Sequence, residues 1–210
     1  TGLRNPSLYE LYGTDSFGYS GNKNLDPEKS ISNEITFNYN FNDKIKFSTN
    51  LFRTSIRNNI EYSSNKYIND NDNIDLVQSG FDSHIEFGDK NLNYNFFSSY
   101  LSSKTKSGAD QLRRPSKRYG LNIYKKFGND QSNGINLNLS YTHYGKHFDT
   151  HSSTFARTEM DSTDIMDIKL SKNYGNITSF IKITNLLNET YQRPHGYNQE
   201  KRYLKLGINY

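Results

Sequence analysis

Hydrophobic and polar residues alternate strictly along several stretches of this chain. The first such stretch follows a polar, turn-rich segment and begins at Ile31. Its odd positions carry mostly large apolar side chains, at Ile31, Ile35, Phe37, Tyr39 and Phe41, whereas Ser, Glu, Thr and Asn fill the even ones. Because successive side chains of a strand point to opposite faces, this pattern predicts a strand with one apolar and one polar face.

The same alternation recurs through the rest of the chain and predicts about nine strands of roughly ten residues each. The later strands are expected near residues 45–51, 74–87, 92–100, 119–127, 135–141, 166–170, 177–183 and 204–210, with 74–87 the least regular. No stretch shows a convincing helical period. The sequence therefore predicts an all-β fold.

The connections between these strands alternate in length. Short polar turns are expected at 42–44, 88–91, 128–133 and 173–176, and long connections at 56–73, 102–116, 148–162 and 186–200. This alternation is typical of an antiparallel transmembrane β-barrel, with periplasmic turns at one rim and extracellular loops at the other. Strands of ~9–11 tilted residues are long enough to cross a bilayer.

The composition is unusually polar for a membrane protein, with 32% hydrophobic residues and a mean hydropathy of −0.92. A wide barrel explains how a membrane protein can have so polar a composition, because half of each strand faces lipid and half faces a wet lumen. The 17 Tyr and 13 Phe argue against disorder. The absence of Cys excludes disulfides, and the 26 Lys and Arg are scattered among 22 acids, so no nucleic-acid partner is expected.

A soluble β-sandwich would also give alternating strands, and this alternative stays open at the level of pattern. Against it, the last residue, Tyr210, lies in phase with the apolar face, as at the end of an outer-membrane strand. Nine strands cannot close into a barrel antiparallel, so we expect the chain to be the C-terminal piece of a longer barrel. Residues 1–30 would then form an extracellular loop.

Two motifs in that segment resemble the corresponding loop of TonB-dependent outer-membrane receptors. They are TGLRNPSLYELYG and GNKNLDPEKS. Matching positions are Leu3, Arg4, Pro6, Leu8, Tyr9, Leu11, Tyr12, Gly13, Gly21, Asn22, Asn24, Leu25, Pro27, Glu28 and Ser30. The final stretch, IKITNLLNETYQRPHGYNQEKRYLKLGINY, is similar to the last two strands of the family, including Asn185-Leu186-Leu187-Asn188.

The resemblance implies a 22-stranded barrel of which this chain, residues 1–210, is the C-terminal part. Residues 31–210 would supply strands with short periplasmic turns and long extracellular loops, and the plug domain would lie outside the chain. The expected location is the bacterial outer membrane. Expected partners are outer-membrane lipid and lipopolysaccharide, and the TonB complex, reached through the missing plug; no cofactor and no enzymatic activity are expected.

Within the family, the vitamin B12 (cobalamin) receptors show the nearest motifs. Gln111-Leu112-Arg113-Arg114-Pro115 is similar to their leucine-arginine-arginine run, and His195-Gly196-Tyr197 with Arg202-Tyr203 resembles their final signature. The resemblance implies that Arg113 and Tyr197 touch the corrinoid. Arg4 and Tyr12, together with Tyr9, are further candidates and would line the lumen entrance. Ferric siderophore or haem receptors share the general motifs and remain the alternative.

Each of these residues also has a purely structural interpretation. Arg113 could belong to a basic rim with Arg114, Lys117 and Arg118 that contacts lipopolysaccharide phosphates. Tyr197 could be an aromatic-girdle or loop-packing residue, and loop packing is also open for Arg4, Tyr9 and Tyr12.

Histidines raise the question of other chemistry. His143, His147 and His151 are spaced by four residues, which aligns ligands on a helix but not on a strand, so interfacial or exposed histidines are expected rather than a metal site. An outer-membrane protease or lipase would need a positioned Asp, His and Ser set. The available pairs, His147 with Asp149 and His151 with Ser152, are close only in sequence.

Overall fold

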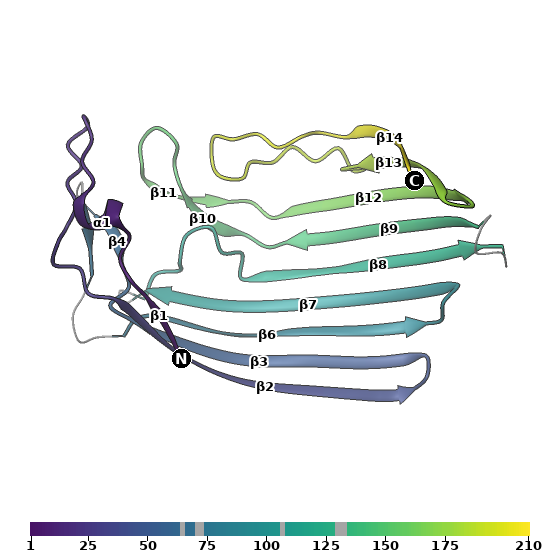
Figure 1. The fold of residues 1–210 in the computed structure, drawn as a ribbon, viewed down its shortest axis with the longest axis horizontal. Helices are drawn as coiled ribbons and strands as arrows, with labels where there is room; N and C mark the ends of the chain where they lie inside the picture. The colour runs from purple at the N-terminus through teal and green to yellow at the C-terminus, as the bar shows by residue number, and fades with distance from the viewer. Residues whose placement is uncertain (64–65, 70–73, 106–107, 129–133) are drawn as a thin grey trace. The chain divides into compact units, whose positions relative to one another are not determined.

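The structure is a computed structural model that describes residues 1–63, 66–69, 74–105, 108–128 and 134–210. Ten strands form one mostly antiparallel sheet in the order β1-β2-β3-β6-β7-β8-β9-β12-β13-β14 (Figure 1). The long strands are β2 (Glu28–Asn42), β3 (Ile45–Arg57), β6 (Ile74–Gly88), β7 (Leu92–Thr105), β8 (Lys117–Phe127), β9 (Ile135–Tyr144), β12 (Thr163–Tyr174), β13 (Ile177–Thr184) and β14 (Tyr203–Asn209). All nine predicted strands are confirmed.

The structure adds elements that alternation cannot reveal because they are too short. They are β1 (Gly2–Arg4), the helix α1 (Leu8–Tyr12), and two hairpins, β4 (Glu61–Ser63) with β5 (Lys66–Ile68) and β10 (His147–Thr150) with β11 (Arg157–Met160). The helix did carry a local signal, a capping box. Ser7 Oγ accepts the Glu10 N–H at 3.2 Å, and the Glu10 carboxylate accepts the Ser7 N–H at 2.6 Å. Residues 1–30 therefore contain a strand and a helical turn.

Three of the predicted turns are observed, and each has a local cause. Asn42 Oδ1 accepts the Lys44 N–H, and Asp89 Oδ1 accepts the N–H groups of Asn91 and Leu92. Gly175 adopts a φ of 59°, which glycine tolerates best. The predicted turn at 128–133 lies, apart from Gly128, outside the described residues, as do 64–65, 70–73 and 106–107 of the long connections.

The apolar face of the strands is exposed. Large side chains of the predicted parity lie open on it, including Ile35, Phe37, Phe96, Ile181, Leu206 and Ile208. Among the described residues the buried hydrophobic side chains are few, namely Tyr19, Leu25, Ile60 and Leu76. A soluble sandwich would bury such a face against a second sheet, whereas a membrane strand turns it toward lipid. Within the described residues, no helix has both the length and the apolar character needed to span a membrane.

The chain divides into two compact units, which are described separately. Unit 1 comprises Thr1–Ile35, Leu51–Gly80 and Ser102–Gln111, and unit 2 comprises Thr36–Asn50, Phe81–Leu101 and Leu112–Tyr210. In unit 1 the loops pack through tyrosines: the rings of Tyr9 and Tyr19 stack at 4.7 Å, and the Tyr19 hydroxyl donates to the Tyr9 carbonyl at 2.7 Å. In unit 2 the turn at 173–176 lies at one end of the strands, and the β10–β11 hairpin and the segment 185–202 lie at the other (Figure 1).

Candidate ligand-binding site

Three connections of unit 2 are tied together at the long-loop end. The Arg113 N–H donates to the Phe148 carbonyl at 2.6 Å, which fastens the segment 112–116 to β10. The Gly145 N–H donates to the Lys117 carbonyl at 2.8 Å and continues the pairing of β8 with β9 beyond the strands. These bonds give the loop residues fixed positions although they lie outside the main sheet.

Asp149 joins all three connections through one buried carboxylate. The residue is 1% exposed, and its Oδ1 accepts from Arg113 Nε at 2.6 Å and from the Thr150 N–H at 2.7 Å. Its Oδ2 accepts the His195 N–H at 2.8 Å. Burial raises the pKa of Asp149, but these hydrogen bonds and the Arg113 charge outweigh it and hold the pKa below its usual value. The carboxylate is therefore ionised and fully engaged.

The segment 185–202 is closed by Asn185, which is 2% exposed and has a φ of 51°. Its amide donates to the carbonyls of Glu189 and Glu200 at 2.9 and 3.2 Å, and its carbonyl oxygen accepts the Glu189 N–H. The Asn-Leu-Leu-Asn motif that carried the resemblance thus fixes the two ends of this long loop.

The middle of the same loop is a narrow arm that carries Arg193 and Tyr197. Gln192 bridges across it to Asn198 at 3.0 Å, and Gln199 donates to the Arg193 carbonyl at 2.7 Å. The Tyr197 N–H closes a turn onto the Pro194 carbonyl at 3.0 Å. The arm is therefore held by hydrogen bonds within itself and by Asp149 at its tip.

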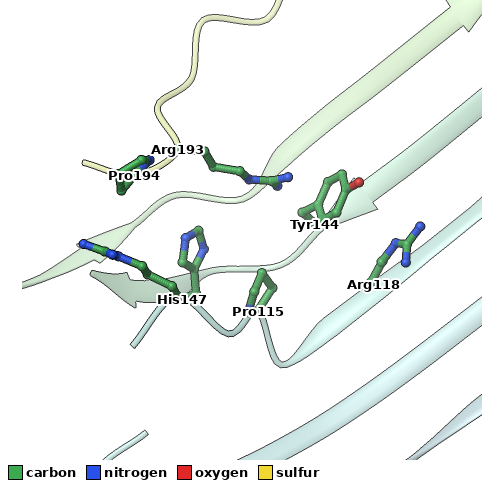
Figure 2. A pocket seen from close by; sticks show the side chains of 7 residues that line it. Pro115, Arg118, Tyr144, His147, Arg193 and Pro194 are labelled. Carbon is green, nitrogen blue, oxygen red and sulfur yellow. The ribbon is translucent and has the colours of Figure 1, made fainter. Parts of the chain in front are cut away.

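Between these connections lies a cavity of about 360 Å³. It is lined by Arg113, Pro115, Arg118, Tyr144, His147, Arg193 and Pro194. Figure 2 shows Arg193 reaching from its loop toward the Tyr144 ring, with His147 and Pro115 between the loops and Arg118 on its strand. Among the described residues that line it are three guanidinium groups and no carboxylate.

Aromatic rings, rather than acids, hold two of these arginines. The guanidinium carbon of Arg193 lies 3.8 Å from the Tyr144 ring centroid, and that of Arg118 lies 5.6 Å from it. Arg118 also lies 5.1 Å from the ring of Phe97. Cation–π contacts fix the direction of a guanidinium and leave its N–H groups available to a further acceptor.

Two buried nitrogens on the cavity wall have no hydrogen-bond partner within the described part of the chain. They are Arg193 Nη2 and His147 Nδ1. Burial has the largest effect on the pKa of His147 and lowers it. The Gly145 backbone raises this pKa, the Arg193 charge lowers it and Asp149 raises it; the net shift is downward, so the ring is neutral at neutral pH. A buried donor without an acceptor is costly, and a bound acceptor would remove that cost.

The strand register places the cavity on the polar face of the sheet. Arg118 pairs with Tyr144 across β8 and β9, and the next pair, Tyr119 with His143, points to the opposite face. There the Tyr119 and His143 rings stack at 4.6 Å, and Tyr119 is among the exposed apolar-face residues. Arg118 and Tyr144 therefore point away from the face that suits lipid.

The structure brings two of the four predicted ligand residues to this region. Arg113 lines the cavity and is bound by Asp149, and Tyr197 lies two residues from His195, which binds the same carboxylate. The Tyr197 side chain is 65% exposed. Their predicted contact with a ligand stays a prediction.

The other two, Arg4 and Tyr12, belong to unit 1. Arg4 is bound by two carboxylates, Glu10 at 2.9 Å and Glu28 at 3.1 Å, as the loop-packing interpretation expects. Tyr12 is exposed, with the Lys23 ammonium 5.6 Å from its ring centroid. A ligand role for either stays a prediction.

The histidines do not form a metal cluster. No group of three or more His, Cys, Asp or Glu able to hold a metal occurs among the described residues. His143 binds Asp164 at 2.8 Å on the apolar face. The Asp149 carboxylate is engaged by other partners rather than aligned with His147 for acid–base chemistry. His151 Nδ1 accepts from Ser153 Oγ and from two backbone N–H groups in an exposed turn, and Ser152 instead donates its N–H to His195.

Sequence reasoning missed Arg193 and weighed Arg118 only as part of a basic rim. The missing information is long-range: Arg193 becomes important because its loop folds back onto Tyr144, about fifty positions earlier in the chain. The one available signal was the Arg193-Pro194 pair directly before the His-Gly-Tyr motif.

A family model described as "TonB dependent receptor-like, beta-barrel" matches residues 1–186. The chain belongs to this family of outer-membrane β-barrels. It is 25% identical over 208 residues to the "Vitamin B12 transporter BtuB" of Vibrio cholerae serotype O1, covering 98% of this chain and 32% of the relative. The chain thus spans about a third of the length of the curated relatives that it matches.

Solved structures of the family share the fold. The ferripyoverdine receptor of Pseudomonas aeruginosa aligns with a TM-score of 0.73 at 13% identity, over 98% of this chain and 29% of that one. The copper transporter OprC aligns with a TM-score of 0.75 at 13% identity, over 98% and 35%. These likenesses show that the chain shares its antiparallel β fold with about a third of each of these barrels, which confirms the predicted fold class.

Proposed function

We propose that the protein containing this chain is a TonB-dependent transporter that takes up cobalamin or a related corrinoid across the outer membrane. The likeness to the vitamin B12 transporter, which extends over nearly the whole chain, carries this proposal. In it, the long-loop end faces the outside and the short turns face the periplasm.

The tied loops of unit 2 support the proposal physically. Cobalamin is large, has a rim of amide groups and carries one phosphodiester, so it needs donors and flat contact area at fixed positions. Arg113 presents a guanidinium whose direction Asp149 fixes, and Tyr197 presents an exposed ring on a closed arm. Pre-ordered loops lose little conformational entropy when they bind.

The same proposal separates binding from transport. The loops would supply ligand affinity and selectivity, and the TonB complex would act through a plug that lies outside this chain. No covalent step is required of the residues described above.

A ferric siderophore is the second candidate ligand, and one observation favours it. The cavity contributes three guanidinium groups, two of them without a carboxylate partner in the described part of the chain, which suits an anionic chelate.

Equilibrium binding of cyanocobalamin to the full-length protein in detergent tests the proposal, with ferric siderophores and haem as competitors. Arg113→Ala and Tyr197→Ala should each weaken binding by about 1 kcal/mol or more. Arg114→Ala, which removes an exposed neighbouring charge outside the cavity, is the matched control and should leave the affinity within twofold. Binding of a siderophore or haem but no corrinoid would keep the family and reject the vitamin.

A further inference from the structure

We propose that the arginine-lined cavity of unit 2 is a binding site for the phosphate group of a ligand that enters from the polar face of the sheet. The inference rests on the proposed function for the identity of that ligand, a corrinoid with a phosphodiester. The phosphate chemistry itself follows from the cavity.

Charge is the first reason. Arg113, Arg118 and Arg193 line the same space, and one carboxylate, Asp149, lies behind Arg113 rather than in the cavity wall. Asp149 takes the Nε edge of Arg113 and leaves that guanidinium's terminal nitrogens free of this contact. Three guanidinium groups lining one space suit an oxyanion with three or four acceptor oxygens better than a single carboxylate.

Unpaired buried nitrogens are the second reason. Arg193 Nη2 is buried without an acceptor, although the same guanidinium is held firmly against the Tyr144 ring. The His147 ring lines the same cavity, and its buried Nδ1 has no side-chain or backbone partner within the hydrogen-bond limits among the described residues. A phosphate oxygen would accept from the guanidinium, and its negative charge would favour protonation of the imidazole into a second donor.

The walls show what would accompany the phosphate. Pro115, Pro194 and the Tyr144 ring give the cavity apolar sides, and its volume of about 360 Å³ exceeds the needs of a bare ion. A phosphodiester with a ring or sugar attached would fill such a space.

The face of the sheet on which the cavity lies distinguishes between lipid A and a transported ligand as the source of the phosphate. Lipid A phosphates lie at the lipid-facing surface, where Tyr119 and His143 point, whereas Arg118 and Tyr144 point to the opposite face. A ligand that passes along the polar face is therefore the source that the register favours.

The test compares two corrinoids on the full-length protein in detergent. Cyanocobalamin carries the phosphodiester, and cobinamide has the same ring without it. Arg193→Gln and Arg118→Gln should each raise the Kd of cyanocobalamin at least tenfold and that of cobinamide less than threefold. Retained cobinamide binding also reports that the loops of each variant are folded.

Arg114→Gln is the matched control, because it removes the same charge from an exposed neighbour that does not line the cavity. It should change neither affinity by more than threefold. The proposal is overturned if both corrinoids weaken equally, if neither weakens, or if Arg114→Gln has the same effect as Arg193→Gln.

Inorganic phosphate separates failure of the site from failure of the proposed function. If the wild type binds neither corrinoid, the function is rejected, and calorimetric titration with phosphate alone still decides the site. Phosphate binding that Arg193→Gln abolishes supports the site, and no phosphate binding to the wild type rejects it. Lipid A micelles that compete with phosphate for the wild-type protein support the phosphate chemistry and reassign its source to lipid.

Discussion

Arginines in the two units are held in opposite ways. Arg4, in unit 1, is enclosed by the carboxylates of Glu10 and Glu28, and both acids have further work: Glu10 caps α1, and Glu28 accepts the Ile60 N–H at 2.8 Å. Arg118 and Arg193, in unit 2, stack on aromatic rings instead. A guanidinium neutralised by built-in acids organises a loop, whereas one positioned by rings keeps its charge and donors for a ligand.

Family motifs of the two units therefore differ in what they leave available to a ligand. The LYELYG and GNKNLDPE motifs of unit 1 supply the helix cap, the two acids and the tyrosine cluster that stabilise a long connection. In unit 2, Asn185 closes a loop in an equivalent way. Asp149 pairs with Arg113, whereas Arg118 and Arg193 have no carboxylate partner among the described residues.

Removal of the Asp149 carboxylate, which joins the loops of unit 2, should have the largest effect on loop stability. Asp149→Ala leaves Arg113 and the N–H groups of Thr150 and His195 without their shared acceptor, at a cost of about 2–3 kcal/mol. Hydrogen exchange of residues 112–116 and 193–199 should therefore accelerate about a hundredfold. Asp161→Ala, at an exposed position, should leave the exchange rate of these segments unchanged. Equal exchange rates in the two variants would show that Asp149 does not hold the loops together.

A carboxylate placed inside the cavity should pair with an arginine of unit 2, as the carboxylates of unit 1 pair with Arg4. His147→Asp puts a carboxylate beside Arg193, where it competes with a bound anion, and should weaken phosphate binding about tenfold or more. His151→Asp makes the same chemical change in a turn outside the cavity. Similar losses in the two variants would indicate a general charge effect and not a site.

Releasing the enclosed arginine of unit 1 should have a smaller, structural effect. Glu10→Gln removes a charged partner of Arg4 and weakens the helix cap, at a cost of about 1 kcal/mol. Hydrogen exchange in residues 4–13 should accelerate about fivefold. Glu61→Gln, which alters an exposed acid of the same unit, should not change it. A large loss of corrinoid affinity in Glu10→Gln would contradict the separation of roles.

Lowering the pH should have the smallest of these effects, through protonation of His147. The pKa of His147 is lowered below 6.5, so folding favours the neutral ring. The stability that this provides is present above pH 6.5 and is lost as pH falls through the lowered pKa. Arg113, Arg118 and Arg193 line the cavity with the ring; of these, the Arg193 charge lowers the His147 pKa, whereas the Gly145 backbone and Asp149 raise it.

A bound phosphodiester, which does not itself titrate in this range, should reverse that preference by adding negative charge. Cyanocobalamin binding should therefore tighten about threefold between pH 7.5 and pH 5.5. The change should be absent in His147→Gln. An equal pH dependence in both proteins would assign the effect to another group.

Alternation along the chain was sufficient to predict the nine long strands, their two faces and the short turns, because a strand's period of two is local. The exposed apolar positions, such as Ile35 and Leu206, are those that the pattern assigns to lipid. Short elements such as α1 and the β10–β11 hairpin were not predicted, because they have too few residues to show a period. Arg113 was found through its motif, and Arg193 was not.

What the sequence determines by itself is thus the strand pattern, the environment of each face and the family, since these depend on neighbouring residues and on motifs. The candidate site required the tertiary structure. Arg113, Arg118, Tyr144, Asp149 and Arg193 lie far apart along the chain, and only the strand register and the folding back of two loops bring them together. These long-range contacts decide whether an arginine pairs with carboxylates or stacks on an aromatic ring, and no local sequence pattern predicts them.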